Sequence, residues 1–143
     1  MDRKMTKVGM VKIIKNSPLL ARTKLKPGDI LYCPSDETDG APLLTFENGI
    51  PLIDYQALSF QKIEIIGFNH VARGGKDGVA TWIVFKPTLS SGTVINTAST
   101  DWCSFNGIGS NRDIQKITRT MILKLFNNDN VFSNESDVAG ISN

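Results

Sequence analysis

The single histidine, His70, and the cysteine at position 103 are the first residues in this sequence that could do chemistry. An imidazole beside a thiol lowers the pKa of the thiol and holds the thiolate as a nucleophile, as in a cysteine hydrolase. Cys103 lies well before the expected helix start at Ser110, so the helix dipole would not stabilise a thiolate there. We keep a Cys/His hydrolase as an alternative hypothesis and expect Cys103 to pack as a small apolar residue.

Two loops carry residue types that bind ions in other proteins. The connection from Arg73 to Gly78 is rich in glycine, but it matches neither G-x-x-x-x-G-K-[ST] nor G-x-G-x-x-G, so we interpret it as a flexible hairpin connection. The segment 34–42, PSDETDGAP, holds carboxylates but lacks the complete calcium-loop pattern, which favours a solvated acidic loop. With one histidine and two distant cysteines, the sequence predicts no metal site and no cofactor.

A third group of residues combines cations with aromatic rings. Arg112, Lys116 and Arg119 recur at helical spacing and could hold a phosphate through charge-assisted hydrogen bonds. An aromatic platform beside them would let a planar base stack. The aromatic residues that could supply it are Phe85, Trp102 and Phe105. The alternative is an ordinary solvated helix face.

Composition bounds the class of protein. The chain has 143 residues, 41% hydrophobic and 21% charged, which predicts one folded domain over residues 1–143. The net charge of +2 does not favour nucleic acid as a partner. No window approaches the ~18 consecutive apolar residues of a membrane span, and the first residues lack the apolar core of a signal peptide. We expect an intracellular protein without a membrane segment.

The elements that must position these residues are predicted to be mostly β-strands. Val79–Phe85 is apolar on both alternating faces except at Thr81, which predicts a central strand, paired in a hairpin with the run that begins at Ile63. Asn48-Gly49 predicts a second hairpin, and Pro27-Gly28 suits the central positions of a type II turn. Further short strands are expected at 8–14, 30–33, 43–46, 50–53 and 93–96.

The segment after Ser110 is the clearest helix. Ser110 or Asn111 can cap its N-terminus, and Asp113 lies in the first turn, where the helix dipole favours an anion. The residues expected to face the core are Ile114, Ile117, Met121 and Leu125, with Ile122 beside them. Before the helix, residues 97–110 are expected to form an ordered loop pinned by aromatic side chains. Residues 1–7 and 128–143 are expected to be flexible.

The strand TWIVFK, the segment VINTAST with a following tryptophan, and the helix start SNRDIQKITR resemble the phage anti-defence proteins that counter the bacterial Thoeris system. The resemblance covers about Ile63 to Arg119 and rests on general pattern. It implies a small α+β domain that works as a homo-oligomer in the host cytoplasm. Such a protein is not an enzyme, because it binds a cyclic ADP-ribose-type signal and leaves it intact. By position, Phe85 would stack on the base, Asn96 would be a polar anchor, and Arg112 and Arg119 would hold the pyrophosphate.

We therefore predict a single α+β domain, with a mainly antiparallel β-sheet and one C-terminal amphipathic helix. The expected function is non-enzymatic sequestration of a nucleotide-like immune signal by a phage protein that forms homo-oligomers. The alternatives are a virion or surface module that recognises a glycan or receptor, and the Cys/His hydrolase. The expected ligand-binding residues are Phe85, Asn96, Trp102, Phe105, Arg112, Lys116 and Arg119.

Overall fold

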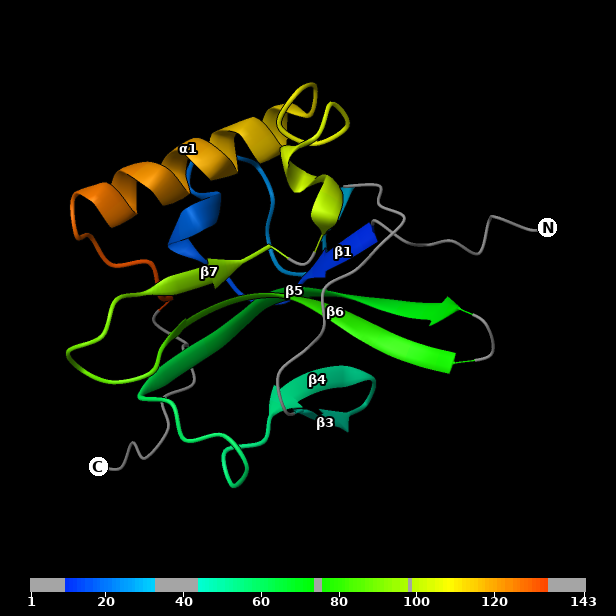
Figure 1. Ribbon diagram of the computed structural model, residues 1–143. Coiled ribbons are helices and arrows are strands. Elements are labelled where there is room, and N and C mark those ends of the chain that lie inside the picture. Colours follow the sequence, from blue (N-terminus) through cyan, green and yellow to red (C-terminus); the bar gives the residue numbers. More distant parts are fainter. Residues whose placement is uncertain (1–9, 33–43, 74–75, 98, 134–143) are drawn as a thin grey trace.

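The protein folds as a five-stranded antiparallel sheet with a helix on one face and a separate β-hairpin on the other (Figure 1). The computed structural model describes residues 10–32, 44–73, 76–97 and 99–133. The strand order in the sheet is β2-β1-β5-β6-β7, and β3 pairs with β4 in a two-stranded sheet. The predicted α+β class, with a mainly antiparallel sheet and a helix late in the chain, is confirmed.

The elements follow the chain in an order close to the one expected from the sequence. They are β1 (Met10–Ile13), η2 (Pro18–Leu20), β2 (Ile30–Tyr32), β3 (Leu44–Glu47), β4 (Ile50–Ile53), β5 (Lys62–Arg73), β6 (Lys76–Lys86), β7 (Val94–Asn96), η3 (Thr100–Cys103) and α1 (Arg112–Phe126). The expected acidic loop at 34–42 and the expected flexible segment at 1–7 lie outside the described residues.

The β5–β6 hairpin is the longest ladder in the described structure and forms the centre of the sheet. Its pairs run from Arg73 opposite Lys76 to Lys62 opposite Lys86. Residues 80–84 of β6 are buried on both alternating faces, which confirms the predicted central strand. The strands extend further toward the turn than expected, because residues 76–78 continue the ladder instead of forming a flexible connection.

The β5–β6 ladder changes register once, at a β-bulge. Ile65 pairs with Ile83, whereas Gly67 pairs with Trp82, so Ile66 is the extra residue on β5. The shift lies next to the position where β1 joins the same strand. It also reverses the alternation of side chains along β5, because a bulge adds one residue to a period of two.

Gly67 lets β1 approach β5 closely. A Cβ atom at this position would lie 2.9 Å from the carbonyl oxygen of Lys12 and 2.9 Å from Cγ1 of Val11. The carbonyl oxygen belongs to the backbone of the paired strand, which cannot shift without disturbing the ladder between β1 and β5. A side chain at position 67 would therefore separate β1 from the sheet.

Two apolar cores lie on opposite faces of the sheet. The core beneath α1, here called the helix-side core, contains Val11, Ile13, Leu19, Leu20, Leu31, Ile66, Ala80, Trp82, Val84, Trp102, Ile114, Ile117, Met121, Val131 and Phe132. The core beneath β3 and β4, here called the hairpin-side core, contains Ile53, Ile63, Ile65 and Ile83, with Phe60 and Phe85 among the residues packed against it. The central strands are therefore covered on both sides (Figure 1).

Local turn chemistry behaves as the sequence predicts. Asn48 and Gly49 both have positive φ, 54° and 80°, as a type I′ hairpin turn between β3 and β4 requires. Gly28 has φ of 99°, which fits the second central position of a type II turn.

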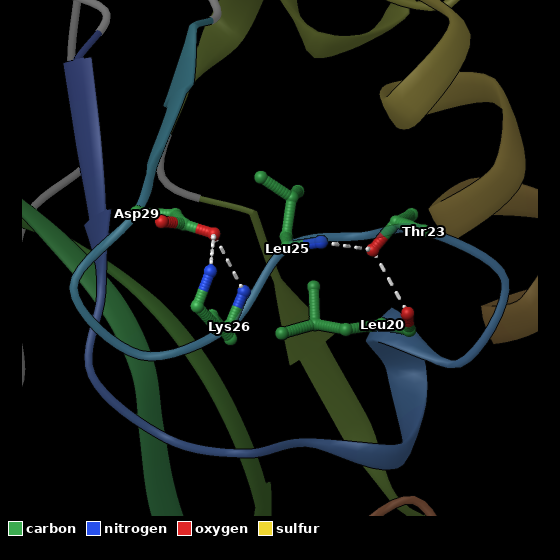
Figure 2. Close-up of polar contacts among 5 residues, drawn as sticks. All are labelled: Leu20, Thr23, Leu25, Lys26 and Asp29. Atoms are coloured by element: carbon green, nitrogen blue, oxygen red, sulfur yellow. Dashed lines mark hydrogen bonds and ion pairs between the residues drawn. The ribbon is translucent and has the colours of Figure 1, made fainter.

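The connection from η2 to β2 is ordered by its own short polar side chains (Figure 2). The hydroxyl of Thr23 donates to the carbonyl oxygen of Leu20 at 2.8 Å and accepts from the backbone N–H of Leu25 at 3.1 Å. The Asp29 carboxylate accepts from the backbone N–H of Lys26 at 3.0 Å and lies 3.7 Å from its ammonium group. The connection therefore delivers the chain to β2 in a defined conformation.

Helix α1 begins where it was expected and buries a narrower face. Asn111 caps it by accepting from the backbone N–H of Ile114 at 3.1 Å, and its amide also donates to the carbonyl oxygen of Tyr32 at 2.8 Å. The expected core residues Ile114, Ile117 and Met121 are buried.

The expectation that Leu125 and Ile122 also face the core is wrong, because they are 43% and 60% exposed. Ile122 is turned about 100° around the helix axis from Met121, which takes it off the buried face. The residues that join the core after Met121 are Val131 and Phe132, in the segment that follows the helix.

Residues 127–133 return from the helix to the sheet and do not behave as the polar tail that was expected from residue 128. Val131 and Phe132 are 2% and 5% exposed. The backbone N–H of Ser133 donates to the two carboxylate oxygens of Glu64 at 3.1 and 3.3 Å, and its hydroxyl donates to the same carboxylate. Because Glu64 is fully buried, these donors replace the water that its carboxylate gives up on folding. Residues 134–143 lie outside the described part of the chain.

Candidate functional site

The structure does not bring the expected ligand-binding residues into one site. Phe85 packs against the hairpin-side core, where its ring stacks on Phe60 with centroids 5.0 Å apart. Arg112, Lys116 and Arg119 lie on α1, which covers the opposite face of the sheet (Figure 1). The central sheet therefore separates Phe85 from the three cations.

The two aromatic residues of the loop before α1 have different environments. Trp102 is 3% exposed in the helix-side core, where its indole N–H donates to the Thr118 hydroxyl at 2.8 Å and its ring lies 5.5 Å from that of Trp82. Phe105 is 75% exposed. The expectation that aromatic side chains pin this loop is thus confirmed for Trp102 and wrong for Phe105. Trp102 is a core residue and offers no open face for stacking.

The remaining expected residues lie at the surface. Asn96 is exposed at the end of β7, where it pairs with Ile83. Arg112, Lys116 and Arg119 are exposed. Within the part of the chain that the structure describes, these three cations form no salt bridge. They match the alternative of a solvated helix face.

The two residues of the hydrolase hypothesis lie on different elements, Cys103 on η3 and His70 on β5. Cys103 is exposed at the end of η3, which corrects the expectation that it packs as an apolar residue. The adjacent Trp102 occupies the core position instead, and consecutive residues of a helical turn point in different directions. His70 pairs with Val79 in the β5–β6 ladder. Among the described residues, no group of three His, Cys, Asp or Glu side chains could hold a metal ion.

An open pocket of about 400 Å³ lies where β5 begins and β6 ends, against the segment that follows α1. Seven of its ten lining residues are polar, and they bring amide, hydroxyl, ammonium and carboxylate groups. The lining residues are Gln61, Lys62, Lys86, Leu89, Thr93, Asn128, Asp129, Asn130, Val131 and Phe132. This polar concavity is the candidate functional site.

Lys62 and Lys86 give this pocket its chemistry. They are directly opposed in the β5–β6 ladder, so both side chains leave the sheet on the same face. Like charges placed directly opposite each other on a sheet destabilise it. Within the described residues neither lysine forms a salt bridge, and the Asp129 carboxylate in the same lining is not paired with either. An anion bound between the two ammonium groups would neutralise charge that the described residues leave without a salt bridge.

Residues 128–132 form one wall of the pocket, and their conformation is set by local contacts. The Asn130 amide donates to the carbonyl oxygen of Phe132 at 2.7 Å, and its oxygen accepts from the backbone N–H of Phe132 at 3.1 Å. The Lys62 ammonium lies 4.6 Å from the centroid of the Phe132 ring, within range of a cation–π interaction. Together with the Ser133–Glu64 contacts, these interactions present a preformed wall to a ligand.

Sequence reasoning missed this site, although two signals for it are present. Glu64 stands alone among isoleucines in the run from Ile63 to Ile66, and a carboxylate in a buried strand needs donors from another segment. The pair Val131-Phe132 is an apolar island in a segment that was otherwise interpreted as a polar tail. Both signals pointed to docking of residues 127–133 on β5.

Comparison of the chain with protein-family models, with curated proteins and with solved structures found no match in any of the three. In the described residues there is also no helix with the length and apolar character needed to cross a bilayer.

Proposed function

We propose that the protein binds a small anionic ligand of the nucleotide class and holds it without transforming it. The observation that carries this proposal is the Lys62–Lys86 pair, two like charges opposed on one face of the sheet and lining a concave pocket. Phosphate and pyrophosphate groups would accept hydrogen bonds from both ammonium groups. The amides of Gln61, Asn128 and Asn130 line the same pocket and add donors and acceptors.

The biological setting of the proposal comes from the resemblance of the segment Ile63 to Arg119 to phage proteins that counter the Thoeris system. In that setting the ligand is a cyclic ADP-ribose-type immune signal, captured in the cytoplasm of the infected host by a homo-oligomer. The binding site moves from the aromatic and cationic residues expected from the sequence to the Lys62–Lys86 pocket. Arg112, Lys116 and Arg119 then serve as a comparison surface of similar charge on α1.

Calorimetric titration of the protein with ADP-ribose and with pyrophosphate tests the proposal. Lys86→Met should weaken binding of both about 10- to 100-fold, because a hydrogen bond to a charged group contributes about 1.5–3 kcal/mol. The matched control is Lys116→Met, an exposed lysine on α1, which should bind as the unmodified protein does. Equal losses in the two variants, or no binding of either ligand, would contradict the Lys62–Lys86 site.

Mass spectrometry of the ligand after denaturation tests whether the protein transforms it. ADP-ribose should be recovered unchanged, and binding should raise the unfolding temperature because the ligand binds the folded state. Recovery of a cleaved product that is lost in Cys103→Ala would instead support the hydrolase alternative.

A further inference from the structure

A second pocket of about 580 Å³ adjoins the first at the same end of the β5–β6 hairpin. It lies between the connection that leads into β5 and the connection that leaves β6. Two aromatic residues, Tyr55 and Phe60, and three hydroxyl residues, Ser59, Thr88 and Ser90, are among its lining. In contrast to the first pocket, its described lining carries no charged side chain.

The two pockets meet at Gln61 and Leu89, which line both. The backbone N–H of Gln61 donates to the carbonyl oxygen of Pro87 at 2.9 Å, one residue beyond the Lys62–Lys86 pair. This hydrogen bond holds the two connections together at the junction. A group bound in the second pocket would therefore contact Gln61 and Leu89, which also line the lysine pocket.

The connections that form the second pocket are ordered by their own side chains. The Asp54 carboxylate accepts from the backbone N–H groups of Gln56 at 3.1 Å and Ala57 at 3.3 Å. The Ser91 hydroxyl donates to the carbonyl oxygen of Thr88 at 2.9 Å and accepts from its backbone N–H at 3.0 Å. These local bonds shape the pocket before a ligand arrives, which lowers the entropic cost of binding.

The chemistry of this lining fits a polyhydroxylated ring. Aromatic faces pack against the C–H surface of such a ring, and hydroxyl and amide groups exchange hydrogen bonds with its hydroxyls. Phe60 is supported from behind by its stack on Phe85. Phe85, expected from the sequence to touch a ligand, thus acts one layer away from the pocket as a support.

We propose that the second pocket is the subsite for a sugar ring whose phosphate is held between Lys62 and Lys86. The ligand class is a sugar phosphate, free or as part of a larger molecule, bound around the end of the β5–β6 hairpin. This assignment rests on the proposed function, because it takes the anion site as given. It adds that the protein recognises the group attached to the phosphate.

Calorimetric titration with inorganic phosphate, ribose 5-phosphate and ribose separates the two pockets. Ribose 5-phosphate should bind about five- to tenfold more tightly than phosphate, and ribose alone should bind more weakly than ribose 5-phosphate. Tyr55→Ala should abolish this preference while leaving the phosphate affinity unchanged, and Tyr55→Phe should retain it because the ring remains. Tyr32→Ala is the matched control, since Tyr32 is an exposed tyrosine on β2.

The outcomes distinguish failure of the subsite from failure of the anion site. Equal affinity for phosphate and ribose 5-phosphate, or an unchanged preference in a folded Tyr55→Ala variant, would overturn the sugar subsite and leave the anion site standing. Binding of neither phosphate nor ribose 5-phosphate would overturn both. Thermal unfolding of each variant checks that it has folded.

Discussion

The cations of α1 and the lysines at the end of the β5–β6 hairpin differ in how the fold holds them. Arg112, Lys116 and Arg119 are spaced by four and three residues along an open helix face, where water hydrates each one separately. Lys62 and Lys86 are held directly opposite each other, half-buried, in the lining of the pocket. The proposed anion site therefore rests on concavity and cross-strand pairing and not on the number of cations.

The largest effect is expected when the wall of the pocket is removed and both sets of cations stay in place. Glu64→Ala leaves the backbone N–H and hydroxyl of Ser133 without their acceptor and opens a void beside β5. We expect the free energy of unfolding to fall by about 2–4 kcal/mol, measured by urea denaturation. Pyrophosphate binding should be lost in the same variant, because residues 128–132 no longer form the wall.

Glu64→Gln is the matched variant for this test. It keeps one carbonyl oxygen to accept from Ser133, so its loss of stability and of binding should be smaller than in Glu64→Ala. A folded Glu64→Ala variant with unchanged pyrophosphate affinity would show that the wall does not contribute to the site.

Charge reversal at one residue of each set gives the next largest difference. Lys86→Glu should abolish measurable pyrophosphate binding, because the carboxylate would repel the anion and attract Lys62 in its place. Arg119→Glu introduces the same change of charge on α1 and should alter the affinity less than about twofold, because salt and water screen an exposed charge. If calorimetric titration shows a larger loss of pyrophosphate affinity in Arg119→Glu, the anion site lies on α1 instead.

The smallest expected effect concerns the protein without ligand. Because like charges directly opposite each other destabilise a sheet, Lys86→Met should raise the free energy of unfolding by about 0.2–1 kcal/mol, the range of cross-strand pair energies. Lys116→Met should leave it within about 0.5 kcal/mol, as for most surface substitutions. A loss of stability in Lys86→Met at low ionic strength would show that Lys62 and Lys86 do not destabilise the sheet. Their cross-strand repulsion would then no longer support a bound anion.

The parts of the fold that depend on local chemistry follow from the sequence. Three examples depend on residues within a few positions of each other: the positive φ angles at Asn48 and Gly49, the cap at Asn111 and the buried strand around Trp82. The limits of the buried helix face do not follow from the sequence. Leu125 has the right spacing for the core and is exposed, because its burial depends on where the chain goes after the helix.

The candidate site depends on contacts between residues that are far apart in the sequence. Hydrophobic periodicity does not predict such contacts. Lys62 and Lys86 each flank an apolar run, which the sequence shows, but their opposition depends on strand register. Counted along a regular ladder from the Arg73–Lys76 pair, Lys62 would face Pro87. The hydrogen bonds of Ser133 to Glu64 join residues 69 positions apart, which no local pattern predicts.

The bulge at Ile66 makes β5 two short strands in opposite phase. Before the bulge, the odd-numbered residues Ile63 and Ile65 face the hairpin-side core. After the bulge, the even-numbered Phe68 takes the same face, where it pairs with Thr81. The half that contains Gly67 is committed to close contact with β1. The other half is free of that constraint and can turn Lys62 and Glu64 toward the pocket and its wall. A single inserted residue thus divides one strand between holding the sheet together and presenting the residues of the proposed anion site.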